Sequence, residues 1–218
     1  MRSETLETLR SELAARLGYA SQGASIGQLQ SNIDNALFNA QQQLYWQHDW
    51  RYLTKYSDKT IGDDQTLVDY PTDCNPLRVL NIAVLYNSIY MTLEQGIPIE
   101  LYTTLELPGP PKRYEARVQI EVWPKTDQSY SLRLWYIKNL AAFTQNNDVT
   151  TIDADLVFLH ALSNLKAHYR HPDAASYASQ FNELLGRMKA KNQQQNVVHF
   201  GDHAEVITQR PLVVGRDI

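Results

Sequence analysis

The chain opens with apolar residues at the spacing of amphipathic helices. Four leucines stand three or four residues apart and form one stripe: Leu6, Leu9, Leu13 and Leu17. Ser3 can cap this first helix, which we expect to end at Leu17. A second stripe runs from Ile26 to Leu44, after a capping box in which the Ser25 hydroxyl and the Gln28 side chain satisfy first-turn amides. The two helices predict a hairpin that needs a further partner to bury its apolar faces.

The middle of the chain alternates in the manner of β-strands. Residues 50–57 alternate in this way, and the turn signal at Gly62 predicts that residues 66–70 pair back on them as a hairpin. The further elements expected are a buried strand at 78–86, a short helix at 98–105, a stiff proline loop at 107–111, and strands at 114–123 and 130–138 joined by a turn at 124–127. This stretch predicts an antiparallel β domain.

Helical spacing returns after Val149. One apolar face is marked by Leu156, Leu159, Leu162, Leu165 and Tyr169. Asp153 or Asp155 can cap this helix, and Pro172 ends it. A second helix repeats apolar residues from Tyr177 to Met188. We expect these two helices to pair with the N-terminal hairpin, because each hairpin has an apolar side to cover.

These patterns predict an α+β fold. It consists of a four-helix bundle built from both chain ends, an inserted antiparallel β domain and an extended C-terminal tail. The expected boundaries are 1–48 and 151–191 for the bundle, 49–150 for the β domain and 192–218 for the tail. The tail starts with a polar, Gln-rich link at 192–196 and continues with small apolar clusters. It has too little apolar surface for its own core, but enough to dock on a partner.

Composition narrows the classes of protein. Of 218 residues, 43% are hydrophobic and 20% charged, which is typical of a globular chain rather than a disordered one. The net charge of −4 argues against a free-standing DNA-coating protein, because neutralising phosphates needs a basic excess. The single cysteine, Cys74, excludes an intramolecular disulfide and a cysteine-only metal cage. The acidic start and the short apolar runs predict no targeting segment and no membrane span.

Candidate catalytic and metal-binding residues do not converge. Six histidines are present, but His160 and His168 stand two helical turns apart, too far to share one ion. Cys74 follows an acidic residue, which disfavours a reactive thiolate. Asp63 and Asp64 fall on a predicted turn, where carboxylates are usually solvated. No familiar catalytic or phosphate-binding motif occurs, so we predict no enzyme activity, no cofactor and no metal site.

The densest feature is a run of aromatic residues: Tyr45, Trp46, Trp50, Tyr52 and Tyr56. Aromatic side chains interleaved with bases can stack nucleotides, but only Arg51 and Lys55 accompany this run. We interpret it as core packing where the helical part hands over to the sheet.

The order of these segments resembles a known family. The fragments are the helix hairpin ending at Tyr45, a Trp-bearing junction at 46–50, the β segments Tyr70-Pro71-Thr72-Asp73, Arg78-Val79-Leu80, Ile120-Glu121-Val122-Trp123-Pro124 and Leu132-Arg133-Leu134-Trp135-Tyr136, and the acidic step Asp153-Ala154-Asp155-Leu156 that opens a helix ending Lys166-Ala167-His168-Tyr169. In this joint order, over about residues 3–190, the chain resembles the head-to-tail adaptor of short-tailed bacteriophages, the tail tubular protein A type.

The resemblance implies a structural virion protein rather than an enzyme. Such adaptors form a ring, usually of twelve copies, that docks under the portal, extends the DNA channel and offers an attachment face to the tail nozzle and fibres. The implied partners are therefore further copies of the chain, the portal protein, the nozzle protein and tail fibres, with DNA only in non-specific passage. A mildly acidic chain suits a conduit, because an acidic lumen repels phosphates and lets DNA slide.

The C-terminal tail carries the residues that we expect to dock on the portal. They are Val197, Val198, Phe200, Val206, Ile207, Leu212, Val213 and Val214. As an adaptor, the protein is expected at the head–tail interface of the virion after synthesis in the host cytoplasm. Two other interpretations stay open: a tail-completion or stopper protein of the virion, and a cellular ligand-binding module with a β domain.

Overall fold

We describe the chain from a computed structural model, which covers residues 2–19, 26–103 and 107–194. The helices are α1 (Leu6–Arg16), α2 (Ile26–Gln47), α3 (Ala154–His168) and α4 (Ala174–Gln194), with short 3-10 turns η1 (Arg51–Leu53) and η2 (Ile99–Tyr102). The strands are β1 (Thr54–Ile61), β2 (Leu67–Val68), β3 (Cys74–Tyr86), β4 (Ile89–Thr92), β5 (Glu94–Gln95), β6 (Arg113–Ala116), β7 (Ile120–Trp123) and β8 (Tyr130–Lys138). The predicted α+β class is confirmed.

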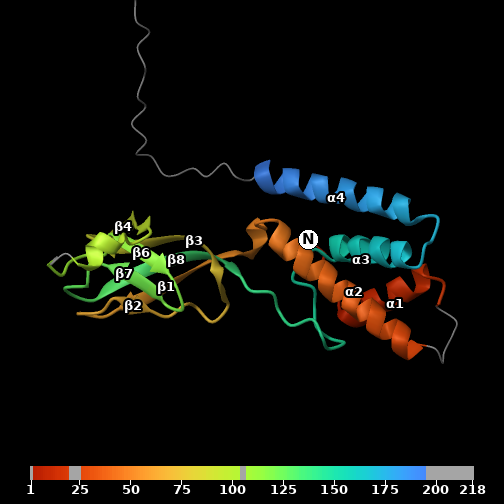
Figure 1. The fold of residues 1–218 in the computed structure, drawn as a ribbon, viewed down its shortest axis with the longest axis horizontal. Coiled ribbons are helices and arrows are strands. Elements are labelled where there is room, and N and C mark those ends of the chain that lie inside the picture. The colour runs from red at the N-terminus through yellow and green to blue at the C-terminus, as the bar shows by residue number, and fades with distance from the viewer. Residues whose placement is uncertain (1, 20–25, 104–106, 195–218) are drawn as a thin grey trace, which may run out of the picture.

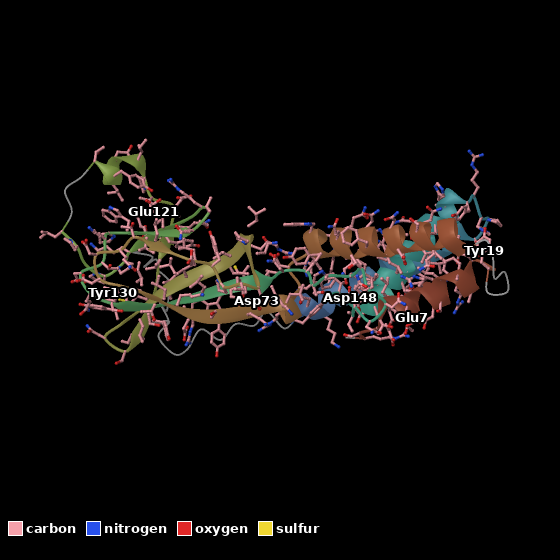
Figure 2. The ribbon with its side chains drawn as sticks, turned by 90° about the horizontal axis from the view of Figure 1, so that it is seen from below. Glu7, Tyr19, Asp73, Glu121, Tyr130 and Asp148 are labelled. Atoms are coloured by element: carbon pink, nitrogen blue, oxygen red, sulfur yellow. The ribbon has the colours of Figure 1, made fainter. Side chains whose placement is uncertain are left out.

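The molecule is elongated, with the helices at one end and the strands at the other (Figure 1). Glu7 and Asp148 lie in the helical end, and Glu121 and Tyr130 lie in the strand end (Figure 2). Each end has its own group of buried apolar residues. None of the helices described is both long and apolar enough to cross a membrane.

The helical end is organised around α3. This helix packs against α1, α2 and α4, and α4 lies along its outer side (Figure 1). The core contains the apolar stripe of each helix, including Leu9 of α1, Leu37 of α2, Leu162 of α3 and Phe181 of α4. The three-and-four spacing seen in the sequence therefore marks the buried face of every helix.

Polar caps set the helix starts. Asp153 caps α3 as expected, because its carboxylate accepts from the backbone N–H of Asp155 at 3.1 Å. The predicted cap of α1 was wrong: Thr5, not Ser3, accepts from the N–H of Thr8. The capping box predicted at Ser25 lies outside the described residues.

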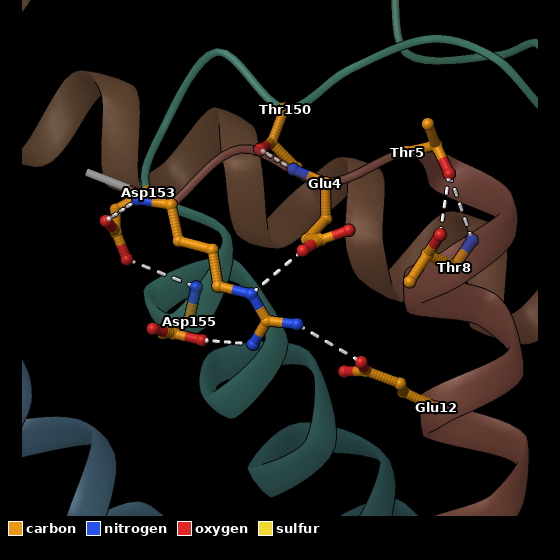
Figure 3. Close-up of polar contacts among 8 residues, drawn as sticks. Glu4, Thr5, Thr8, Glu12, Thr150, Asp153 and Asp155 are labelled. Atoms are coloured by element: carbon orange, nitrogen blue, oxygen red, sulfur yellow. Dashed lines mark hydrogen bonds and ion pairs between the residues drawn. The ribbon is translucent and has the colours of Figure 1, made fainter.

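The N-terminal segment lies across the start of α3 and is hydrogen-bonded to it (Figure 3). Its backbone accepts from the N–H groups of Thr150 and Ala154. The Arg2 guanidinium bonds the carboxylates of Glu4 and Asp155 at 3.0 and 2.8 Å. The Arg2 backbone N–H donates to Asp153 at 2.9 Å. The two chain ends of the helical part are thereby joined.

The strands form two sheets that enclose the second core. One has the order β1-β8-β3-β4 and the other β2-β7-β6-β5. All the pairings are antiparallel except β5 with β6. Leu132 and Leu134 of β8 are fully buried in the same core as Ile120 and Val122 of β7. Alternation along β8 thus marks one buried face, and the strand predicted at 130–138 is confirmed.

One predicted strand pairing and one predicted strand were wrong. Residues 66–70 do not pair back on β1: β2 pairs with β7, and β1 pairs with β8 along its whole length. The expected strand 114–123 is a hairpin of β6 and β7, broken at Val118. A turn can reverse the chain locally, but the choice of partner follows burial, and Val68 is buried only in the second sheet.

Three predicted segment types were also corrected. The expected strand start at Trp50 is the 3-10 turn η1, and the short helix predicted at 98–105 is limited to the 3-10 turn η2. Helix α4 extends to Gln194, into the stretch interpreted as a polar link. Polar Gln and Asn residues are compatible with a helix when its apolar stripe is already packed, as Phe181 and Leu185 are.

Candidate assembly surfaces

Arg78 of β3 joins the two ends of the molecule. Its guanidinium donates to the carbonyl oxygens of Tyr45 at 2.6 Å and His48 at 3.0 Å, at the C-terminal end of α2. It also pairs with the Asp49 carboxylate, and only 8% of its side chain is exposed. A cation at this position complements the negative end of the helix dipole. Arg78 therefore caps a helix from the neighbouring core.

Amide side chains complete this joint. Asn75 of β3 donates to the Tyr45 hydroxyl at 2.8 Å. Asn192 of α4 accepts from the Arg51 N–H at 2.9 Å and donates to the Asp49 carbonyl at 3.1 Å. The C-terminal ends of α2 and α4 are thus both hydrogen-bonded to the segments that lead into the sheet. Between them lies a hollow of about 530 Å³, whose lining includes the exposed side chain of Trp46.

The sheet β1-β8-β3-β4 has an outer face rich in aromatic residues. Arg133 of β8 binds Asp58 of β1 through two hydrogen bonds of 2.7 Å. Its guanidinium lies 4.7 Å from the ring centroid of Tyr56 and 4.2 Å from that of Tyr90. The paired Arg133 holds the pKa of Asp58 below its usual value. Aromatic residues and arginine are enriched at protein–protein interfaces, which makes this face a candidate contact surface.

The predicted loops gather at the far end of the sheets. The Thr126 hydroxyl donates to the Gly62 carbonyl at 2.6 Å, and the Gly109 N–H donates to the Lys125 carbonyl at 2.8 Å. The turn at 124–127 therefore holds together the other two loops singled out in the sequence. In the proline loop, Gly109 is buried and Leu107 is 85% exposed. The loops at this end of the sheets are therefore held to one another by hydrogen bonds.

The aromatic run divides between core and surface. Tyr45 and Trp50 are buried, and the Trp50 indole donates to the Leu44 carbonyl at 2.8 Å, so core packing is confirmed for both. The interpretation was wrong for Trp46 and Tyr56, which are 56% and 63% exposed. Tyr52 is 40% exposed. The spacing of these aromatic residues predicts helix or strand, but it does not show which face of the sheet is covered and therefore which rings are buried.

The titratable residues weighed for chemistry are buried or paired with a neighbouring side chain. Cys74 is buried, and burial together with the Asp73 charge raises its pKa to about 11. Asp64 pairs with Lys125 on the exposed turn. His160 stacks on Phe181 at 4.6 Å, and burial lowers its pKa. Among the described residues, no three His, Cys, Asp or Glu side chains are grouped so that they could hold a metal ion.

The eight residues predicted to dock on the portal, from Val197 to Val214, lie outside the described residues. Conversely, the sequence interpretation missed Arg78 and Arg133. A usable signal was present, because each is a charged residue inside an apolar strand pattern. Such a residue requires a partner when the strand is packed.

Comparison with protein families identifies a match. A family model described as SU10 adaptor protein matches residues 5–202. The match spans all four helices and both sheets. Among curated proteins, no sequence matches the chain.

Proposed function

The chain belongs to the SU10 adaptor protein family, structural adaptors of phage virions, and from this premise we propose that it is a ring-forming head-to-tail adaptor. In this proposal the ring, of about twelve copies by the resemblance to tail tubular adaptors, docks under the portal and extends the DNA channel. It also offers an attachment face to the tail nozzle and fibres. The observation that carries the proposal is the family match over nine-tenths of the chain.

We assign the two ends of the molecule to two tasks. The helical residues 1–48 and 151–191 form the body of the ring, and the β residues 49–150 face the next tail component. Separate buried cores support this division, and the Arg78 joint supports a fixed angle between the parts. The outer sheet face around Arg133 and the turn at 124–127, with the loops at Gly62 and 107–111 that it holds, are the surfaces that would meet the nozzle.

The tail is assigned to the portal. Residues 192–218 begin in the last turn of α4, where Asn192 is anchored at the joint. The apolar clusters from Val197 to Val214 supply the side chains for docking, with an energy that arises from apolar burial on the partner. DNA passes through the ring without specific contacts, which the net charge of −4 favours.

Co-sedimentation with portal rings of the same phage tests the proposal. The full chain is compared with a chain ending at Gln194, which keeps both described cores. A second variant replaces Val197, Val198 and Phe200 by serine and keeps the tail length. We expect the full chain to sediment with the portal and both variants to stay in solution. Failure of the full chain to bind would contradict the adaptor role, and normal binding of both variants would contradict the role of the tail.

A further inference from the structure

The outward face of α2 has no charge. From residue 29 to 47, its exposed side chains are Ser31, Asn32, Asn35, Phe38, Asn39, Gln42, Gln43, Trp46 and Gln47. Phe38 is 39% and Trp46 56% exposed, although both are large aromatic residues. The helix contains one charged residue, Asp34, and its carboxylate is held by Arg10 at 2.8 and 3.1 Å. We call these nine residues the amide face.

The face of a helix that is in contact with water rarely lacks charged residues. Soluble surfaces carry about 25–35% charged residues, so nine exposed positions would normally include two or three. Protein interfaces, in contrast, are depleted of Lys, Glu and Asp and enriched in aromatic residues. The amide face therefore has the composition of a surface that a protein covers.

The outward face of α4 is complementary in size. It exposes small side chains at Ser176, Ser179, Gly186 and Ala190, interleaved with the longer exposed side chains of Gln180, Glu183, Arg187 and Lys191. Its central charges, Glu183 and Arg187, pair with each other one turn apart. We call the side of α4 that carries Ser176, Ser179, Gly186 and Ala190 the small face. Large side chains that project from one helix fit against the positions on a second helix where the side chains are short, and the Glu183–Arg187 pair would enter the contact with its charges balanced.

Gly186 points independently to a partner. It lies inside α4, where glycine is less favourable than alanine. Its backbone does not require glycine, since its φ is not positive, and a Cβ added there would meet no described atom within 4 Å. Nothing in the described parts of the chain explains why this position is small. Close approach of a helix from another molecule does.

The two faces lie on different helices, with α3 between them. Helix α3 contacts both α2 and α4 and lies between them (Figure 1). One edge of the amide face lies beside α3: Asn32, Asn35, Asn39 and Gln43 border a hollow that they share with Asn164, Leu165 and His168 of α3. Asn32 also donates to the Tyr169 hydroxyl at 3.2 Å. The amide face and the small face still belong to different helices, and two different surfaces on one subunit produce a head-to-tail contact, which closes into a ring when the rotation allows.

We infer that the amide face of one copy packs on the small face of a second copy, and that this contact repeats around the ring. The inference rests on the proposed function, because it identifies the lateral contact of the proposed adaptor ring. In this contact, Phe38 and Trp46 lie against the short side chains of α4 in the neighbouring copy.

Cross-linking of mixed variants tests the contact. Asn39→Cys on the amide face and Ser179→Cys on the small face are prepared as two separate proteins, assembled with portal rings and treated with a bismaleimide that spans about two helical turns, roughly 11 Å. The native Cys74 is buried, so the unaltered protein serves as the background. We expect cross-linked dimers from the mixture and none above background from either variant alone.

Each other result is decisive. Rings that form without cross-linked dimers, or dimers from one variant alone, would overturn the pairing of these faces and leave the adaptor role intact. Unaltered protein that forms no ring with the portal would overturn the adaptor role and, with it, this contact.

A charge substitution gives a second test. Gln42→Lys would bury an unpaired ammonium in the contact, and we expect it to weaken assembly about tenfold or more without changing the melting temperature. The control is Val118→Lys, which changes a side chain that is 96% exposed in the β6–β7 turn. Equal assembly by the two variants would overturn the inference.

Discussion

The guanidinium of Arg78 lies 4.5 Å from the ring centroid of Tyr45, and it donates a hydrogen bond to the carbonyl of the same residue. Arg78 belongs to a strand and Tyr45 to the last turn of a helix, so one side chain connects the two cores. Asn75 holds the hydroxyl of the same tyrosine. The orientation of the β end relative to the helical end is therefore fixed by polar contacts around a single ring.

Replacing Arg78 should loosen this joint. Arg78→Leu leaves the carbonyls of Tyr45 and His48 without their donor, and we expect the free energy of unfolding to fall by about 2–3 kcal/mol. Arg78→Lys keeps the charge but loses the planar fork, so we expect a smaller loss. Urea unfolding followed by tryptophan fluorescence measures both. Unchanged midpoints for Arg78→Leu would show that the joint contributes nothing to stability.

Gly186→Ala should act in opposite directions on folding and assembly. Alanine has the higher helix propensity, and the site has open space around its Cβ, so we expect the isolated chain to gain about 1 kcal/mol. The added methyl group obstructs the close helix contact, so assembly on the portal should weaken. Thermal unfolding and portal co-sedimentation give the two readouts. A variant that is more stable and assembles normally would contradict the small-face contact.

Asp153 should be important for the start of α3. Its carboxylate accepts from the backbone N–H groups of Asp155 and Arg2, and the residue is 5% exposed. Asp153→Ala should cost about 1–2 kcal/mol, because both N–H groups lose their acceptor. Asp153→Asn keeps an acceptor oxygen and should cost less. Calorimetry that finds the two variants equally stable would contradict the capping role.

Stability should fall as the pH drops below 6.5. Burial lowers the pKa of His160 in the folded state, and the same cause lowers that of His48. The unfolded chain therefore binds more protons than the folded chain over the range below 6.5, and protonation favours unfolding. His160 Nδ1 has no hydrogen-bond partner among the described residues, and burial outweighs the contact with the Ala40 backbone, which favours the charged ring.

A pair of histidine variants tests this dependence. His160→Phe keeps the stacking on Phe181 and removes the proton site, so the loss of stability between pH 7 and pH 5.5 should become smaller. His168→Gln changes an exposed histidine on the same helix and serves as the control. Urea midpoints at the two pH values measure the effect. An unaltered pH dependence in His160→Phe would assign it to other groups.

The helices could be predicted because their signal is local. The stripe from Leu6 to Leu13 and the cap at Asp153 depend on residues within a few positions of each other. Strand pairing could not be predicted, since β1 and β8 stand about 70 residues apart and alternation does not specify a partner. The resemblance to a phage adaptor family was confirmed. It relied on the order of the segments along the chain, which does not depend on how the strands pair.

The candidate surfaces were harder to predict for the same reason. Alternation within 50–57 does not reveal that Tyr56 lies on an open sheet face, because that depends on what the second sheet covers. The Arg78 joint connects residues about 30 positions apart. The uncharged stretch of α2 was visible in the sequence, but its meaning requires knowing that the stretch is exposed.

Electron microscopy of the purified protein, alone and mixed with its portal, tests the central claim most directly. The account predicts rings of about a dozen subunits, or a ring of density continuous with the portal. In these rings the helices should lie side by side and the β ends should point away from the portal. A protein that stays monomeric and leaves the portal bare would contradict the adaptor account.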